Sequence, residues 1–318
     1  MISSIAFGLF GLAVLISVAL AFSHQRKSVD WKQILAGVGL QVVFAVVVII
    51  VPGGREFFDA ISRVFVKIVD FALIGGQFIF GDLSNADEFG FIFAFQVLPT
   101  IIFFASLMGV LYHIGLMQKI VQGMAWVMLK VLRVSGSESL SVAANVFIGQ
   151  TEAPLVVRPY IAKMTESELF TMMVGGMATI AGAVLAAYIA MLGGTDEAAR
   201  LFYARHLLAA SVMAAPATIV ISKLLRPETE ESLTKGTVHL EIEKTATNVI
   251  EAAANGAADG VKLSLTVAGM LLAFFALITM INYPLEWIGQ VTGIETLTGQ
   301  TLSLTWILGY ILSPLAWI

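Results

Sequence analysis

Apolar runs long enough to cross a lipid bilayer recur along the whole chain, and they constrain the fold more than any other feature. They cover residues 2–22, 31–51, 91–112, 169–192, 206–225, 261–283 and 302–318. A helix of about 20 residues spans the hydrocarbon core of a membrane. With 58% hydrophobic and only 13% charged residues among 318, the chain is predicted to be an all-α, multi-pass membrane protein with about seven transmembrane helices.

The first apolar run has a competing interpretation as a cleaved signal peptide, because residues 19–21 read Ala-Leu-Ala. However, no Lys or Arg precedes the run, and it is long for a signal core. We therefore interpret it as a transmembrane helix. Arg26, Lys27 and Lys32 follow it, and basic loops favour the cytoplasm, so the N-terminus is predicted to lie outside.

Residues 53–70 differ from the transmembrane runs. Arg55, Arg63 and Lys67 are spaced among Phe, Ile and Val side chains at helical intervals. This pattern is typical of an amphipathic helix that lies at the membrane interface. Residues 71–89, which are rich in Gly and acidic side chains, are expected to form a connection.

Residues 135–169 read SGSESLSVAANVFIGQTEAPLVVRPYIAKMTESEL and place polar groups inside an otherwise apolar region. Two capping boxes are predicted here, because Ser135 precedes Glu138 and Thr165 precedes Glu168 at the required spacing. Each capping box marks the start of a helix.

The helix that starts near residue 136 is expected to end at Gly149, since Gly is common at helix C-termini and Pro154 follows closely. The next helical piece is expected to begin near Thr151. Two half-helices would then meet at a polar tip, forming a re-entrant hairpin. Transporters use such interruptions to present helix ends to ligands and ions.

Enzymatic chemistry finds little support in the sequence. The chain has no Cys, and its four His residues share no metal-binding spacing. It also has no phosphate-binding Gly-rich loop and no nucleophile elbow. An intramembrane enzyme that uses Glu152 as acid or base would lack a partner nucleophile, so the chain is predicted not to be an enzyme.

The polar segment carries a resemblance to a known family. NVFIGQTEAPLVVRPYIAKMTESELF, followed by MVGGMATIAGAVLAAY, closely resembles the bacterial concentrative nucleoside transporters. The segments GFIFAFQVLPTIIFFASLMGVLYHIGLMQ, MAAPATIVISKLLRPETE and NVIEAAANGAADGVKLSLTVAGMLLAFFALI extend the resemblance over nearly all the chain. It implies an inverted-repeat transporter fold, a homotrimer and a bacterial inner membrane. The family's second hairpin has no counterpart in these residues, so the C-terminal repeat is expected to be incomplete.

The resemblance also implies a substrate site. Gln150, Thr151 and Glu152 would bind the nucleobase, and Val184 and Leu263 would supply apolar contact. A pyrimidine edge offers hydrogen-bond donors and acceptors, and Gln, Thr and Glu side chains can match both. The ribose-binding residues of the family lie beyond the matched part.

A sodium site is implied beside the hairpin. It would use the side chains of Asn145 and Thr179 and the backbone carbonyls of Ile148 and Ile180. These hard oxygen ligands suit a small hard cation. Without the resemblance, Asn145 and Thr179 would more often be hydrogen-bonding residues between helices.

The resemblance predicts Na⁺-coupled symport of nucleosides such as uridine into the cell by alternating access. Proton coupling and a nucleoside-binding sensor that does not transport remain alternatives. The expected partners are a nucleoside, the bilayer and two further copies of the chain, with no nucleic acid and no organic cofactor. The predicted divisions are N-terminal scaffold helices (1–112), the hairpin and a following broken helix (113–193), a scaffold helix with a cytoplasmic linker (194–247), and further transport and scaffold helices (248–318).

Overall fold

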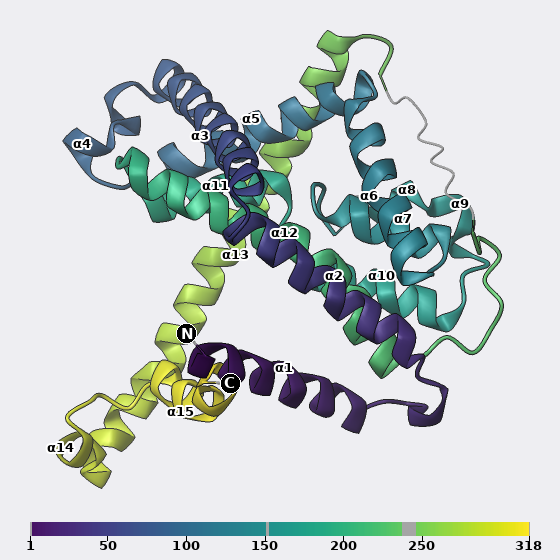
Figure 1. Ribbon diagram of the computed structural model, residues 1–318. Helices are drawn as coiled ribbons and strands as arrows, with labels where there is room; N and C mark the ends of the chain where they lie inside the picture. Colours follow the sequence, from purple (N-terminus) through teal and green to yellow (C-terminus); the bar gives the residue numbers. More distant parts are fainter. Residues whose placement is uncertain (1, 151–152, 237–245, 318) are drawn as a thin grey trace. The chain divides into compact units, whose positions relative to one another are not determined.

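The computed structural model describes residues 2–150, 153–236 and 246–317, in which every regular element is a helix (Figure 1). Six helices of the described part are long and apolar enough to cross a membrane, and residues 7–21 and 304–314 form shorter apolar helices. The all-α membrane class is therefore confirmed, while the number of about seven transmembrane helices stays a prediction.

The chain divides into two compact units. One unit consists of residues 1–18 and 265–318, and the other consists of residues 19–264. The first unit contains parts of α1 (Ile2–Ala21) and α13 (Val249–Thr292), together with α14 (Ile294–Thr298) and α15 (Leu304–Trp317). All the predicted site residues that the structure describes fall within the second unit.

Helix α12 is central to the packing of the second unit, where it contacts α2, α3, α10 and α11. Its long course beside α2 is visible in Figure 1.

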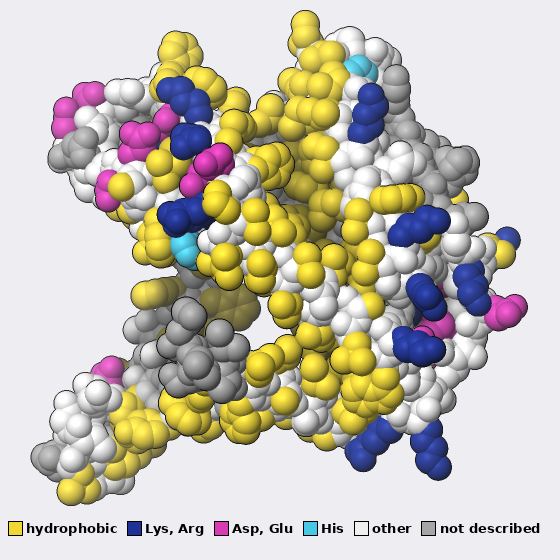
Figure 2. Space-filling model, in the orientation of Figure 1, with side chains coloured by type: hydrophobic (Ala, Val, Ile, Leu, Met, Phe, Trp, Pro, Cys, Tyr) yellow, Lys and Arg dark blue, Asp and Glu magenta, His cyan; other side chains and the backbone are white. Residues whose placement is uncertain are grey.

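The helices of this unit are α2 (Trp31–Ile49), α3 (Pro52–Phe80), α4 (Ala86–Phe89), α5 (Phe93–His113), α6 (Leu116–Leu132), α7 (Gly136–Asn145), α8 (Ala153–Val156), α9 (Arg158–Ile161), α10 (Glu166–Ala178), α11 (Gly182–Gly193) and α12 (Glu197–Leu225). Figure 2 shows that hydrophobic side chains cover much of the visible surface, as expected for a chain whose solvent is lipid.

The boundaries predicted around α3 are wrong. The helix continues to Phe80 rather than ending at residue 70, so the connection is shorter than the expected 71–89. The reason is tertiary packing: the buried face of α3 continues through Gly76, where an added Cβ would lie 3.3 Å from Pro99 of α5. The glycine that suggested a loop instead permits close helix contact. The interfacial position of this helix stays a prediction.

Two ion pairs join α3 to α12. Arg200 Nη1 lies 2.6 Å from Asp70 Oδ1, and Arg205 Nη1 lies 3.1 Å from Asp59 Oδ1. Helix α12 begins at Glu197 and contains both arginines, so the N-terminal end of α12 is fixed against α3 by charge as well as by packing.

Glycines allow α5 and α13 to approach backbone to backbone. A Cβ added at Gly256 would lie 2.6 Å from the carbonyl oxygen of Ala105, and one at Gly260 would lie 2.8 Å from Cα of Ile102. Ser106 Oγ donates a hydrogen bond of 2.8 Å to the carbonyl of Ala253. Small residues four apart are typical of such close contacts in membranes.

We expect Gly256→Val to destabilise the protein by about 1–3 kcal/mol, because the new side chain has no space against α5. Gly269→Val is a matched control in the same helix, since nothing lies within 4 Å of a Cβ at that position. Thermal unfolding in detergent measures both. Equal melting temperatures for the two variants would contradict the assigned contact.

Candidate functional site

Both predicted capping boxes are confirmed. Ser135 Oγ accepts a hydrogen bond of 3.2 Å from the Glu138 amide, and Glu138 Oε2 accepts one of 3.2 Å from the Ser135 amide. Thr165 and Glu168 form the same reciprocal pair at 3.2 and 2.8 Å. These pairs start α7 and α10, the two helices that lead into the candidate site.

The first interruption follows α7. The helix ends at Asn145, before the expected end at Gly149. The amides of Phe147 and Ile148 both bond to the carbonyl of Ala144, at 3.0 and 2.9 Å, so the last turn tightens and stops. Helical structure resumes in α8 at Ala153. The predicted helix, break and helix are confirmed, while Thr151 and Glu152 lie outside the described residues.

The second interruption separates α10 from α11. Thr179 has an extended backbone, with φ −114° and ψ 158°, and Gly182 is the first residue of α11. Thr179 Oγ1 donates a hydrogen bond of 2.9 Å to the carbonyl of Gly175 in the preceding turn. The break predicted in the helix after the hairpin is therefore present, and Ile180 lies inside it.

The two interruptions meet in space. The Gly182 amide donates a hydrogen bond of 2.9 Å to the carbonyl of Phe147. A Cβ added at Gly175 would lie 3.3 Å from Asn145 Nδ2, and one at Gly176 would lie 3.0 Å from Gln150 Cβ. Glycine at these positions lets the end of α7 and the hairpin tip pack closely on the α10 backbone.

Asn145 is the most informative of the predicted ion ligands. It is 1% exposed, and neither its Oδ1 nor its Nδ2 has a hydrogen-bond partner within the described residues. A buried amide without partners costs about 1–3 kcal/mol, so its presence requires an explanation. The C-terminal ends of α7 and α10, which carry partial negative charge, both lie beside it.

Ser141 was missed by the sequence reasoning. It lies one helical turn before Asn145, is fully buried, and its Oγ also has no partner in the described part of the chain. Residues four apart share one face of a helix. The available signal was a hydroxyl and an amide four residues apart in the helix that leads to the interruption.

Of the predicted nucleobase residues, the structure describes Gln150, Val184 and Leu263. Gln150 is exposed at the tip, and Val184 is half-buried in the first turn of α11. Leu263 of α13 is half-buried and packs on an apolar cluster that includes Ala183 and Ala186 of α11. The two apolar residues are therefore associated with α11, whereas Gln150 lies against Gly176 of α10.

Family models match successive parts of the chain. The Na⁺-dependent nucleoside transporter N-terminus matches residues 10–83, the nucleoside-recognition gate matches 94–195, and the Na⁺-dependent nucleoside transporter C-terminus matches 206–318. An uncharacterised transporter of Haemophilus influenzae is 42% identical over 316 residues, which cover 99% of this chain and 72% of the relative. This chain belongs to the concentrative nucleoside transporter family.

Other members of the concentrative nucleoside transporter family agree with this assignment. Human sodium/nucleoside cotransporter 1 is 40% identical over 97% of this chain, which spans 45% of the human protein. The solved structure of CNTnw in an inward-facing substrate-bound state is 42% identical, with a TM-score of 0.85 over 98% of this chain and 72% of that one. The family consists of transporters rather than enzymes. The match to the nucleoside-recognition gate contains both interruptions.

Proposed function

We propose that this chain takes part in Na⁺-coupled symport of nucleosides such as uridine. The unpartnered buried amide of Asn145 between two broken helices is the observation that carries the proposal. The mammalian relatives named as sodium/nucleoside cotransporters support the choice of ion and substrate class.

In the proposed cation site, Asn145 Oδ1 and Thr179 Oγ1 are ligands together with the carbonyl oxygens of Ile148 and Ile180. Thr179 donates its hydroxyl proton to Gly175, so its oxygen lone pairs remain available to a cation. The ends of α7 and α10 add partial negative charge. Amide, hydroxyl and carbonyl oxygens are the ligands that hard cations prefer, and transporters place them at interrupted helices.

The proposed substrate site lies at the adjoining hairpin tip. Gln150, Thr151 and Glu152 bind the nucleobase edge, because their side chains together can donate and accept hydrogen bonds. Val184 and Leu263 contact the apolar face of the base. Val184 is half-buried within α11 and Leu263 is half-buried against it, and these positions support this role.

Coupling follows from the shared segment between the two sites. Ile148 and Gln150 belong to the same non-helical stretch after α7, so a cation that fixes this stretch also fixes the substrate ligands. Binding linkage is reciprocal, and the nucleoside therefore strengthens cation binding equally. We also propose that transport proceeds by alternating access and that the chain assembles as a homotrimer. The proposed location is a bacterial inner membrane, with the N-terminus outside.

Uptake of labelled uridine into proteoliposomes tests this function. An inward Na⁺ gradient is expected to drive uptake in the wild type, and Glu152→Gln is expected to abolish it, while the exposed Glu197→Gln in α12 should have no effect. Uptake driven by a proton gradient without Na⁺ would assign the coupling ion to H⁺. Uridine binding without counterflow would instead favour a sensor that does not transport.

A further inference from the structure

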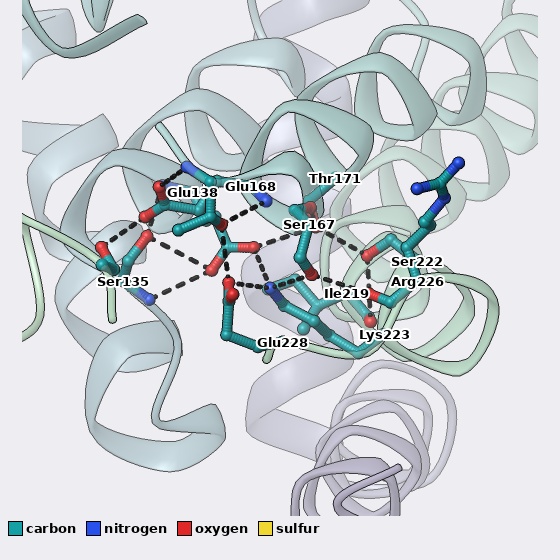
Figure 3. A network of polar contacts seen from close by, with 12 residues as sticks. Ser135, Glu138, Ser167, Glu168, Thr171, Ile219, Ser222, Lys223, Arg226 and Glu228 are labelled. Atoms are coloured by element: carbon teal, nitrogen blue, oxygen red, sulfur yellow. Dashed lines mark hydrogen bonds and ion pairs between the residues drawn. The ribbon is translucent and has the colours of Figure 1, made fainter. Parts of the chain in front are cut away.

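A buried polar network joins α7, α10 and α12 at the ends of α7 and α10 that lie away from the candidate site (Figure 3). Its central members are Glu138 of α7, Glu168 and Thr171 of α10, and Lys223 of α12, and none is more than 3% exposed. Charged groups are seldom buried so completely unless they are paired. The network thus concentrates buried charged and polar side chains at one place in the fold, where they must pair with one another.

The two capping boxes are cross-linked through this network. Glu138 caps α7 and also accepts a hydrogen bond of 3.0 Å from Thr171 Oγ1 of α10. Glu168 caps α10 and also accepts one of 3.1 Å from Ser137 Oγ of α7. Each glutamate therefore serves its own helix and its neighbour, and an axial shift of one helix against the other would break both bonds.

Lys223 fixes this pair of helices to a third. It forms an ion pair with Glu138 and donates a hydrogen bond of 2.8 Å to Ser167 Oγ of α10. Oγ of the neighbouring Ser222 lies 2.9 Å from Thr171 Oγ1. Figure 3 shows Glu138, Ser167, Thr171, Ser222 and Lys223, which come from the three helices, joined by dashed contacts.

The polar linker after α12 covers the network. Ser232 Oγ donates to Glu168, and Thr234 contacts both the amide and the hydroxyl of Ser137 at 3.1 and 2.9 Å. The linker carbonyl of Thr234 also accepts a hydrogen bond of 3.0 Å from the Gly136 amide. Water is thereby excluded, and the register of the three helices is fixed by satisfied polar contacts.

Helical geometry connects the network to the candidate site. Asn145 lies seven residues beyond Glu138 on α7, and Thr179 follows eight residues after Thr171 at the end of α10. At a rise of 1.5 Å per residue, these separations are about 10 and 12 Å. A shift in register at the network is transmitted along such short rigid helices, whereas an ion site tolerates displacements of only about 0.5 Å.

We propose that Ser137, Glu138, Glu168, Thr171 and Lys223 are positioning residues that set α7 against α10 and thereby tune the cation affinity of the site at their far ends. The effect on affinity rests on the proposed function, whereas the positioning itself does not. The network residues lie at the opposite ends of α7 and α10 from the proposed ion ligands, so their effect on the ion site is transmitted through the two helices.

Thr171→Val and Ser137→Ala test the proposal with little risk to folding. Each removes a hydroxyl cross-link between the helices but leaves the ion pair and both capping boxes intact. Thr100→Val in α5 is the matched control, because Thr100 is equally buried and, among the described residues, its hydroxyl bonds to Gln96 of its own helix rather than to another helix. We expect the Na⁺ concentration for half-maximal uptake to rise roughly fivefold in each test variant, with maximal uptake retained.

A second readout does not depend on transport. The chain has no native Cys, so a Gln150→Cys/Gly176→Cys pair reports the contact between the hairpin tip and α10 without background. A Cβ added at Gly176 would lie 3.0 Å from Cβ of residue 150, so the two positions need to separate by less than 1 Å to reach the roughly 3.8 Å that is typical of a disulfide. Oxidative cross-linking of this pair should slow several-fold when Thr171→Val or Ser137→Ala is added, but not with Thr100→Val.

The outcomes separate the two proposals. Unchanged cross-linking in the test variants would overturn the positioning role, whatever the transport result. Slower cross-linking with an unchanged Na⁺ half-saturation would overturn the link to cation affinity. Slower cross-linking in a protein whose uptake never responds to Na⁺ would uphold the positioning of α7 on α10 and reject the proposed coupling ion.

Discussion

Replacing Asn145 with Ala is expected to raise the Na⁺ concentration for half-maximal uptake more than tenfold, while stability without Na⁺ stays within about 1 kcal/mol of the wild type. In the absence of a cation, the Asn145 amide has no hydrogen-bond partner among the described residues. Its removal therefore relieves an unsatisfied buried group, and this gain offsets the packing that is lost. With Na⁺ present, the same change removes a proposed ligand.

Thermal unfolding with and without Na⁺, together with Na⁺-dependent uptake, measures both effects. Leu140→Ala provides the comparison, because Leu140 is 1% exposed in the same helix and its truncation should cost about 2–5 kcal/mol under both conditions. Suppose instead that Asn145→Ala melted as early as Leu140→Ala and kept its Na⁺ response. Asn145 would then be a hydrogen-bonding residue between helices rather than an ion ligand.

Lys223→Met is expected to cost about 3–5 kcal/mol, because it leaves the Glu138 carboxylate buried without its charged partner. Glu138→Gln should cost less, since Lys223 keeps a second carboxylate, Glu228, at 3.4 Å. The double variant Glu138→Gln/Lys223→Met is expected to recover much of the loss. Glutamine also preserves the capping box, which accepts either Glu or Gln.

The yield of monodisperse protein and its melting temperature in detergent compare the three variants. The signature of the buried pair is a double variant that is more stable than Lys223→Met alone. A double variant that lost the sum of the two single effects would show that Glu138 and Lys223 contribute independently.

Local chemistry allowed much of the hairpin to be predicted from the sequence. A capping box needs only two residues three apart, so the starts of α7 and α10 at Ser135 and Thr165 were readable without tertiary information. The interruption near Gly149 followed from Gly and Pro in the same way. Asn145 is buried beside this interruption, and its role as an ion ligand stays a prediction.

Features that depend on distant parts of the chain were not predictable. Lys223 forms an ion pair with Glu138 from another helix, and no local sequence pattern around either residue predicts this pair. The predicted end of α3 at residue 70 was wrong because Gly76 packs on Pro99 instead of forming a turn. In both cases the decisive neighbour lies far along the sequence, where periodicity and propensity carry no information.

The hydrogen bond from the Gly182 amide to the Phe147 carbonyl links the two interruptions through backbone atoms alone. Any opening of the hairpin away from α11 must expose this amide to solvent. The hydrogen–deuterium exchange rate of this amide therefore reports how often the hairpin opens, and no side chain has to be altered to measure it. Slow exchange of the Gly182 amide would mean that the site stays assembled when no ligand is bound. Fast exchange would mean that the site opens between binding events and assembles again for each one.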